Sequence, residues 1–134
     1  MRFLVHPMAV HFPVALWLTS ALLDLLYLRR GDLFYFRAAR GLIGLGLLGA
    51  AVSVATGFAD ALPLAAQGVG QAFVDRHRVH QGFAYLSTLM YAASFLIRWR
   101  RPSVGSAVVA ALMVAGAALI AVTGWLGGEL RLVM

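Results

Sequence analysis

The chain has 134 residues, of which 62% are hydrophobic and 12% charged, and its formal net charge is +6. A soluble domain of average composition has about twice that charged fraction, so the composition indicates an integral membrane protein. No nucleotide-binding loop, nucleophile elbow or nucleic-acid module is present. The positive charge is therefore expected to flank membrane spans, and no nucleic acid is expected as a partner.

Four apolar stretches, at about 8–29, 36–62, 78–98 and 103–126, are each long enough for a membrane-spanning helix, which needs roughly 20 residues. Backbone groups in lipid must bond internally, and this requirement excludes an open sheet. The sequence therefore predicts an all-α integral membrane bundle of four helices with up-down topology. Residues 1–134 are expected to form this single transmembrane domain, in contact with the lipid bilayer.

Short turns are expected between the helices of each half. Arg29-Arg30-Gly31-Asp32 combines a glycine that can take the left-handed conformation with an aspartate that can cap the next helix. Arg100-Arg101-Pro102-Ser103 should end the third helix and cap the fourth. The segment from Gln67 to Asp75 is expected to form a short amphipathic helix on the outer surface.

Arginines are divided unequally between the two ends of the predicted bundle. Seven lie at the two tight turns, namely Arg29, Arg30, Arg37, Arg40, Arg98, Arg100 and Arg101, and four lie at the other end, namely Arg2, Arg76, Arg78 and Arg131. The positive-inside rule then predicts that the turns are cytoplasmic and both termini are outside, in a bacterial-type inner membrane. Phe34, Tyr35 and Trp99 would form an aromatic belt at the cytoplasmic interface.

The two halves resemble each other, which indicates a weak internal repeat. His6 and His77 are 71 residues apart, as are Arg30 and Arg101, and Thr56-Gly57 lies 67 residues before Thr123-Gly124. A parallel repeat gives a pseudo-two-fold axis along the membrane normal. Small residues are expected to line one face of the second and fourth helices: Gly46, Ala50, Ser53 and Gly57, and Ala117, Ala121, Gly124 and Gly128.

A combination of motifs resembles DUF2231, a bacterial family of small predicted membrane proteins with a domain of unknown function. The motifs are His6-Pro7, His11-Phe12-Pro13, the turn from Thr56-Gly57 to Asp60, the histidine that opens the third helix, and the closing run from Gly124 to Leu130. The resemblance covers nearly the whole chain. It implies a four-helix membrane protein and supplies no activity.

The histidines give the strongest indication of chemistry, because all four are expected at the outer face: His6, His11, His77 and His80. His77 and His80 are three residues apart and share a helix face. His6 and His11 diverge by about 140° on an ideal helix. Pro13 cannot donate a hydrogen bond to the carbonyl of Ala9, and we expect this irregularity to aim His11.

Imidazole is the usual iron ligand where cysteine is absent, and the chain has no cysteine. The sequence therefore favours haem b between the first and third helices, with His11 opposite His80 or His6 opposite His77, and four histidines suffice for two haems. The expected function is that of a b-type cytochrome that passes electrons near the outer face, to or from quinone or another redox partner.

Charged residues at the same face have expected roles beside the histidines. Arg76 and Arg78 are suited to haem propionates. Asp60 and Glu129 are expected to accept hydrogen bonds from the imidazole nitrogens that do not bind iron. Asp24, near the cytoplasmic end of the first helix, is expected to pair with Arg40 or Arg98, in a solvated or structural role.

Two other interpretations stay open. The same histidines, with Asp60 or Glu129, could hold zinc, copper or non-haem iron in a mixed nitrogen and oxygen ligand set. Alternatively, the chain is an accessory or structural subunit of a larger membrane complex, with its histidines bonded to helix ends and loops. The spacing matches no metalloenzyme signature, so an electron carrier or a subunit is favoured over a stand-alone enzyme. A proton relay through histidine and carboxylate is a weaker fourth interpretation.

Overall fold

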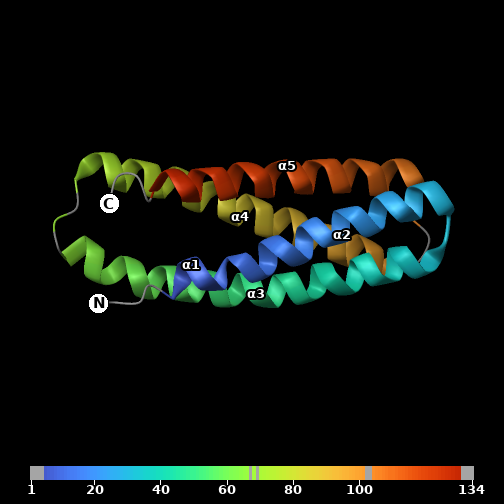
Figure 1. The fold of residues 1–134 in the computed structure, drawn as a ribbon, viewed down its shortest axis with the longest axis horizontal. Helices are drawn as coiled ribbons and strands as arrows, with labels where there is room; N and C mark the ends of the chain where they lie inside the picture. Colours follow the sequence, from blue (N-terminus) through green and yellow to red (C-terminus); the bar gives the residue numbers. More distant parts are fainter. Residues whose placement is uncertain (1–4, 67, 69, 102–103, 131–134) are drawn as a thin grey trace.

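The computed structural model describes residues 5–66, 68, 70–101 and 104–130, and for residues 61–66 the backbone alone. Its helices are α1 (His6–Ala9), α2 (His11–Arg30), α3 (Leu33–Ala66), α4 (Gln71–Arg100) and α5 (Ser106–Leu130). The described part of the chain contains no strand. α1 leads directly into α2, and the four long helices lie side by side in an up-down bundle (Figure 1). The predicted all-α architecture is confirmed.

Three segments are long and apolar enough to cross a membrane: His6–Arg30, Leu33–Asp60 and Ser106–Leu130. α4 has the length but is less apolar than the other three, because histidine, serine, tyrosine and arginine side chains recur along it. It nevertheless packs against both α3 and α5. The third expected span is therefore a bundle helix in which Ser87, Tyr91, Ser94 and Arg98 are buried against its neighbours.

The first expected span has the predicted irregularity near its start. Pro13 has no N–H for the carbonyl of Ala9, and the regular hydrogen bonding is interrupted at Val10, between α1 and α2. Val10 keeps helical dihedral angles, with φ −66° and ψ −23°, and its carbonyl accepts a hydrogen bond from the Val14 amide at 3.3 Å. The proline thus breaks the hydrogen-bond pattern and leaves the helical path intact.

The turn between α2 and α3 is formed as predicted. Gly31 is left-handed at φ +70°, and its amide donates to the carbonyl of Tyr27 at 2.8 Å. The Asp32 carboxylate accepts a hydrogen bond from the Phe34 amide at 2.8 Å. At the other tight turn α4 ends at Arg100, while the cap expected at Ser103 lies outside the described residues.

The turn expected from Thr56-Gly57 to Asp60 is helical instead, and so is the equivalent segment of the second half. Thr56–Asp60 lies inside α3 and Thr123–Trp125 inside α5. Each threonine hydroxyl donates to the carbonyl four residues earlier, so neither side chain competes with the helix for its backbone bonds. The expected surface helix is also wrong in its described part, because residues from Gln71 onward are the first turns of α4; Gln67 and Val69 lie outside the described residues.

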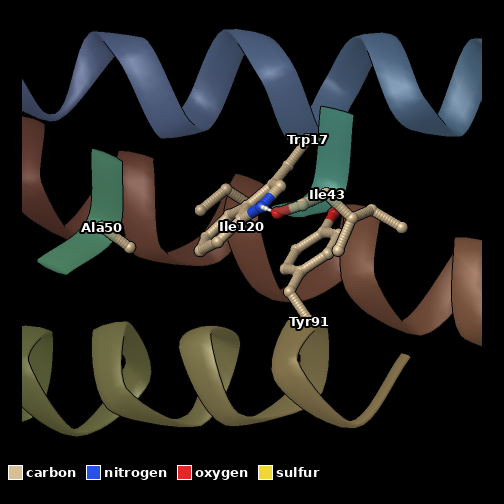
Figure 2. Close-up of a cluster of buried hydrophobic side chains, with 5 residues drawn as sticks. All are labelled: Trp17, Ile43, Ala50, Tyr91 and Ile120. Atoms are coloured by element: carbon tan, nitrogen blue, oxygen red, sulfur yellow. Dashed lines mark hydrogen bonds between the residues drawn. The ribbon is translucent and has the colours of Figure 1, made fainter. Parts of the chain in front are cut away.

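The centre of the bundle is an aromatic stack between the two halves. The rings of Trp17 on α2 and Tyr91 on α4 are nearly parallel, with centroids 4.1 Å apart (Figure 2). The Trp17 indole nitrogen donates to the carbonyl of Ile43 at 3.3 Å. Glycines make room for both rings, since a Cβ at Gly46 would overlap the Trp17 indole and one at Gly116 would lie 2.9 Å from the Tyr91 ring. The stack joins helices that are diagonal in the bundle.

The same contacts define the register of the internal repeat. Equivalent residues of α2 and α4 are 74 apart in the sequence: Trp17 and Tyr91, Ser20 and Ser94, Asp24 and Arg98. Equivalent residues of α3 and α5 are 70 apart: Gly46 and Gly116, Ala50 and Ile120, Ser53 and Thr123. The expected offsets of 71 and 67 are therefore wrong by three residues, about one helical turn.

The register explains the outcome for the small-residue faces. The face predicted on α3 is correct, because Gly46, Ala50 and Ser53 are buried. The face predicted on α5 is wrong, since Ala121, Gly124 and Gly128 are exposed. The inward residues of α5 are Gly116, Ile120, Thr123 and Gly127, each one position earlier than expected.

Candidate functional site

His6 is fixed to the side of α3 by two hydrogen bonds. Its ring nitrogen Nδ1 lies 2.7 Å from the carbonyl oxygen of Ser53. Its backbone amide donates to the Asp60 carboxylate at 3.0 Å. The ring also packs against Gly57, where a Cβ would come within 3.1 Å of Nδ1. Position and orientation of this imidazole are therefore determined by α3.

His80 has the same relationship to α5. Its Nδ1 lies 3.2 Å from the carbonyl oxygen of Thr123, which is the residue equivalent to Ser53. The ring packs against Gly127, where a Cβ would be 3.1 Å from Cε1, and Gly127 is equivalent to Gly57. His6 and His80 are thus the equivalent histidines of the two halves, whereas the sequence paired His6 with His77.

The hydrogen bonds determine the tautomer of both rings. A carbonyl oxygen can only accept, so Nδ1 must be the protonated nitrogen of His6 and of His80. In a neutral imidazole, Nε2 then carries the free lone pair. A backbone carbonyl on one ring nitrogen is the arrangement that orients histidines whose other nitrogen binds a metal. Both rings therefore have a nitrogen available as a ligand.

His77 adds a third imidazole to this end of the bundle. It stacks on Phe73, one helical turn earlier on α4, with ring centroids 5.7 Å apart. Its Nε2 is buried and has no hydrogen-bond partner among the described residues. His77 lies just outside the expected span, and burial lowers the pKa of its imidazole, as does the nearby His6. A buried nitrogen without a hydrogen-bond partner among the described residues is an exception among buried polar atoms and marks a candidate binding position.

His11 differs from the other histidines, because it is exposed and its ring bonds within its own helix. Its Nδ1 lies 2.6 Å from the carbonyl of Pro7, four residues earlier. The structure therefore brings together His6, on α1, with His77 and His80, on α4, and leaves His11 apart.

The charged residues expected beside the histidines have other contacts. Asp60 accepts the His6 backbone amide, and Glu129 forms an ion pair with Arg76 at 3.8 Å, in which both side chains are partly exposed. Arg78 is exposed. The acceptors of the hydrogen bonds from the His6 and His80 rings are the backbone carbonyls of Ser53 and Thr123, rather than the carboxylates of Asp60 and Glu129.

A second polar cluster lies toward the other end of the bundle. The Arg98 guanidinium donates two hydrogen bonds to Asp24, at 2.6 and 2.7 Å, and a third to the Ser94 hydroxyl at 3.1 Å. Both charged side chains are almost fully buried, at 1% and 2% exposure. Of the two arginines expected as partners of Asp24, Arg98 forms the pair, and of the two expected roles the structural one is correct, because the bundle encloses both groups.

The carbonyls of Ser53 and Thr123 are the site groups that the sequence did not reveal, since a backbone carbonyl has no residue-type signal. An indirect signal exists in Gly57 and Gly127. Each glycine lies four residues after the carbonyl and leaves room for the imidazole. Histidine on one helix and glycine on its partner, repeated in both halves, would have identified the pairing.

The fold and site define a membrane protein of four helices with a pair of symmetry-related imidazoles near one end. The family model described as a predicted membrane protein, DUF2231, matches residues 2–134, so the chain belongs to this family. The resemblance inferred from the histidine and glycine motifs is confirmed. Neither a curated protein nor a solved structure matches the chain.

Proposed function

We propose that this membrane protein is a b-type cytochrome in which His6 and His80 bind one haem near the outer end of the bundle. The observation that supports the proposal is the equivalent setting of these two rings. Each has Nδ1 on a backbone carbonyl of the neighbouring helix, and among the described residues neither Nε2 has a hydrogen-bond partner. Bound haem supplies a one-electron couple, and two axial imidazoles tune its potential.

Glycines hold both proposed ligands in place. Gly57 and Gly127 leave the space in which the His6 and His80 rings lie against the backbone of the neighbouring helix. The Nε2 of His77, which has no partner among the described residues, is a further polar group at the same end. Arg76 and Arg78 are both exposed on α4, and their guanidinium groups are suited to bind haem propionates.

A zinc, copper or non-haem iron site has less support than haem. Among the residues that the structure describes, no group of three or more His, Cys, Asp and Glu side chains could hold a metal ion. A protein zinc site needs about three or four such ligands, whereas haem brings four nitrogens of its own and needs two axial imidazoles. The donor set of this chain therefore favours haem.

The test is the absorbance spectrum of the full chain, purified in detergent from cells supplied with a haem precursor. We expect a Soret band and, after reduction, the α and β bands of six-coordinate haem. His6→Ala and His80→Ala should each abolish or shift the spectrum. His11→Ala is the matched control and should leave it unchanged, because this ring is exposed and bonded within its own helix.

A colourless wild-type protein would contradict the proposal. Metal analysis of the same sample would then identify the alternatives: about one zinc, copper or iron per chain without haem supports a non-haem site. Protein that is free of metal but co-purifies with a larger complex supports an accessory subunit. Loss of the spectrum in His11→Ala but not in His6→Ala would exclude the ligand pair proposed above.

The proposed cytochrome also needs a redox partner and a defined orientation in the membrane. Quinone or another redox protein would exchange electrons at the outer face of a bacterial inner membrane, with both termini outside. The excess of arginine at the α2–α3 and α4–α5 turns supports this orientation. Since the chain has no cysteine, single cysteines introduced at Asp32 and at Asp75 can be labelled with an impermeant reagent in intact cells. Labelling at Asp75 alone is expected.

A further inference from the structure

The end of the bundle opposite the histidines is strongly basic. Its exposed arginines are Arg29, Arg30, Arg37, Arg100 and Arg101, and Arg40 is partly exposed. Asp24 and Arg98 neutralise each other in the interior. The remaining described acid at this end is Asp32, whose carboxylate caps α3. Six guanidinium groups against one carboxylate form a surface that attracts anions.

Within this surface, α3 presents one continuous exposed row. Arg37, Gly41, Leu45 and Leu48 follow each other at spacings of four, four and three residues, so they share one helix face. All four are exposed, and the two leucines are 51% and 68% accessible. A Cβ added at Gly41 would meet nothing within 4 Å, so the backbone there is open. The row begins with a cation and continues as an apolar strip.

Beside this row, the contact between α3 and α4 fixes a second cation. The Arg40 guanidinium lies over the Trp99 ring, 5.3 Å from its centroid. Trp99 in turn lies beside Phe95, with ring centroids 5.8 Å apart, and Phe95 packs on Gly44 of α3. Trp99 is 62% exposed and Arg40 is partly exposed, so both side chains are accessible. An aromatic side chain at this level is typical of a membrane interface.

The dimensions of the row match one acyl chain. From Arg37 to Leu48 the helix rises roughly 16 Å at 1.5 Å per residue, which is about half of a hydrocarbon core. A lipid whose phosphate lies between Arg37 and Arg40 would extend its chain over Gly41 toward Leu48. Charge and apolar surface are thus in the order in which a phospholipid presents them.

We propose that this face of α3 and α4 is a binding site for an anionic phospholipid. Arg37 and Arg40 bind the phosphate, Trp99 contacts the headgroup region, and the row from Gly41 to Leu48 receives one acyl chain. The site is at the opposite end from the histidines and does not depend on haem. It therefore stands or fails separately from the proposed electron-transfer function.

The experiment is native mass spectrometry of the full chain in detergent, titrated with phosphatidylglycerol or phosphatidylcholine. We expect phosphatidylglycerol to bind more tightly than phosphatidylcholine. Each arginine removed should weaken that binding about fivefold, and R37Q/R40Q about 25-fold. R37K/R40K keeps the charge and should retain most of the affinity.

Two further variants separate a built site from general surface charge. R29Q/R30Q removes the same charge at the same end but lies outside the row, and it should weaken binding much less than R37Q/R40Q. Gly41→Leu changes no charge and has space in the free protein, yet it should weaken binding by covering the open backbone. If R37Q/R40Q fails to fold, the affinity of Gly41→Leu for phosphatidylglycerol tests the proposal instead.

The proposal is overturned if the two lipids bind equally, because the protein would then have only a non-selective lipid shell. It is also overturned if R29Q/R30Q and R37Q/R40Q weaken the binding of phosphatidylglycerol to the same degree, since net charge alone would then explain the binding. Unchanged affinity in Gly41→Leu would remove the acyl-chain row from the site.

Discussion

Asp24 and Arg98 are equivalent residues of the two halves, and they form a bidentate ion pair at 2.6 and 2.7 Å in the interior of the bundle. In an exact duplication, two like charges would meet across the pseudo-two-fold axis. Buried like charges repel strongly, because little solvent screens them. Opposite charges at equivalent positions therefore favour pairing of one half with the other and disfavour pairing of a half with its own copy.

Removal of one partner from this pair should be costly. Asp24→Ala leaves the Arg98 charge buried and uncompensated, and we expect the free energy of unfolding to fall by about 3–5 kcal/mol. Unfolding in detergent, followed by helicity during titration with a denaturing detergent, measures the change. Asp75→Ala is the matched control, because that aspartate is exposed and bonds only to Gln71 among the described residues. Equal losses in the two variants would contradict the prediction.

The exchange of the two charges tests the pairing itself. D24R/R98D restores an ion pair at the same place with reversed polarity, so it should be more stable than Asp24→Ala despite carrying two substitutions. Recovery will be incomplete, because the Ser94 hydroxyl now bonds to the guanidinium from α4. A double variant that is less stable than either single variant would show that the pair does more than neutralise charge.

The glycines of α3 and α5 should differ in their tolerance of alanine. At Gly46 an added Cβ would overlap the Trp17 indole, whereas at Gly124 it would meet nothing within 4 Å. Gly46→Ala must displace a buried ring and should cost about 1–3 kcal/mol. Gly124→Ala should be neutral or stabilise by up to about 1 kcal/mol through helix propensity. Thermal unfolding of both variants in one detergent gives the comparison, and a neutral Gly46→Ala would show that the stack readjusts.

The two stacked rings should respond unequally to loss of their polar atoms. The Tyr91 hydroxyl is buried without a hydrogen-bond partner among the described residues, while the Trp17 nitrogen bonds to the carbonyl of Ile43. Tyr91→Phe should therefore leave stability unchanged or raise it, and Trp17→Phe should lower it by about 1–3 kcal/mol. Destabilisation by Tyr91→Phe would reveal that the hydroxyl has a partner in the membrane, such as a water molecule.

The protein free of cofactor should lose stability as the pH falls below about 6.5, the ordinary pKa of histidine. Burial lowers the pKa of His77 in the folded protein, so the unfolded chain takes up a proton first and gains stability relative to the folded one. The loss continues until the pH reaches the lowered pKa. His77→Phe keeps the stack on Phe73 and removes the titration, so its midpoint of unfolding should vary less with pH. If the wild-type protein and His77→Phe show the same dependence of stability on pH, then groups other than His77 cause that dependence.

The histidine pairing shows why the site was only partly predictable. The sequence identified the histidines and their shared end, because hydropathy places the apolar spans along the chain, although α4 begins at Gln71, seven residues before the span expected from 78. It aligned the halves on identical residues, His6 with His77, although the contacts align His6 with His80. Three residues are about one turn of helix, so both alignments present a similar face, and only the neighbouring helix distinguishes them.

The α5 face illustrates the same limit at finer scale. Small residues are so frequent in this helix that Ala117, Ala121, Gly124 and Gly128 form as good a stripe as the true inward face. A shift of one residue turns a helix by about 100°. Composition fixes such a face poorly, whereas the fit of Tyr91 on Gly116 and of His80 on Gly127 fixes it well.

By itself the sequence determined that this is a membrane protein, and it determined the four-helix topology, the family and the presence of two similar halves. Those properties follow from apolar length, turn residues and charge distribution, which act locally along the chain. The tertiary structure decided the register of the halves, the enclosure of Asp24 with Arg98 and the carbonyls that orient His6 and His80. These depend on how side chains of one helix fit the backbone of another, and that fit is a property of the packed bundle rather than of any single helix.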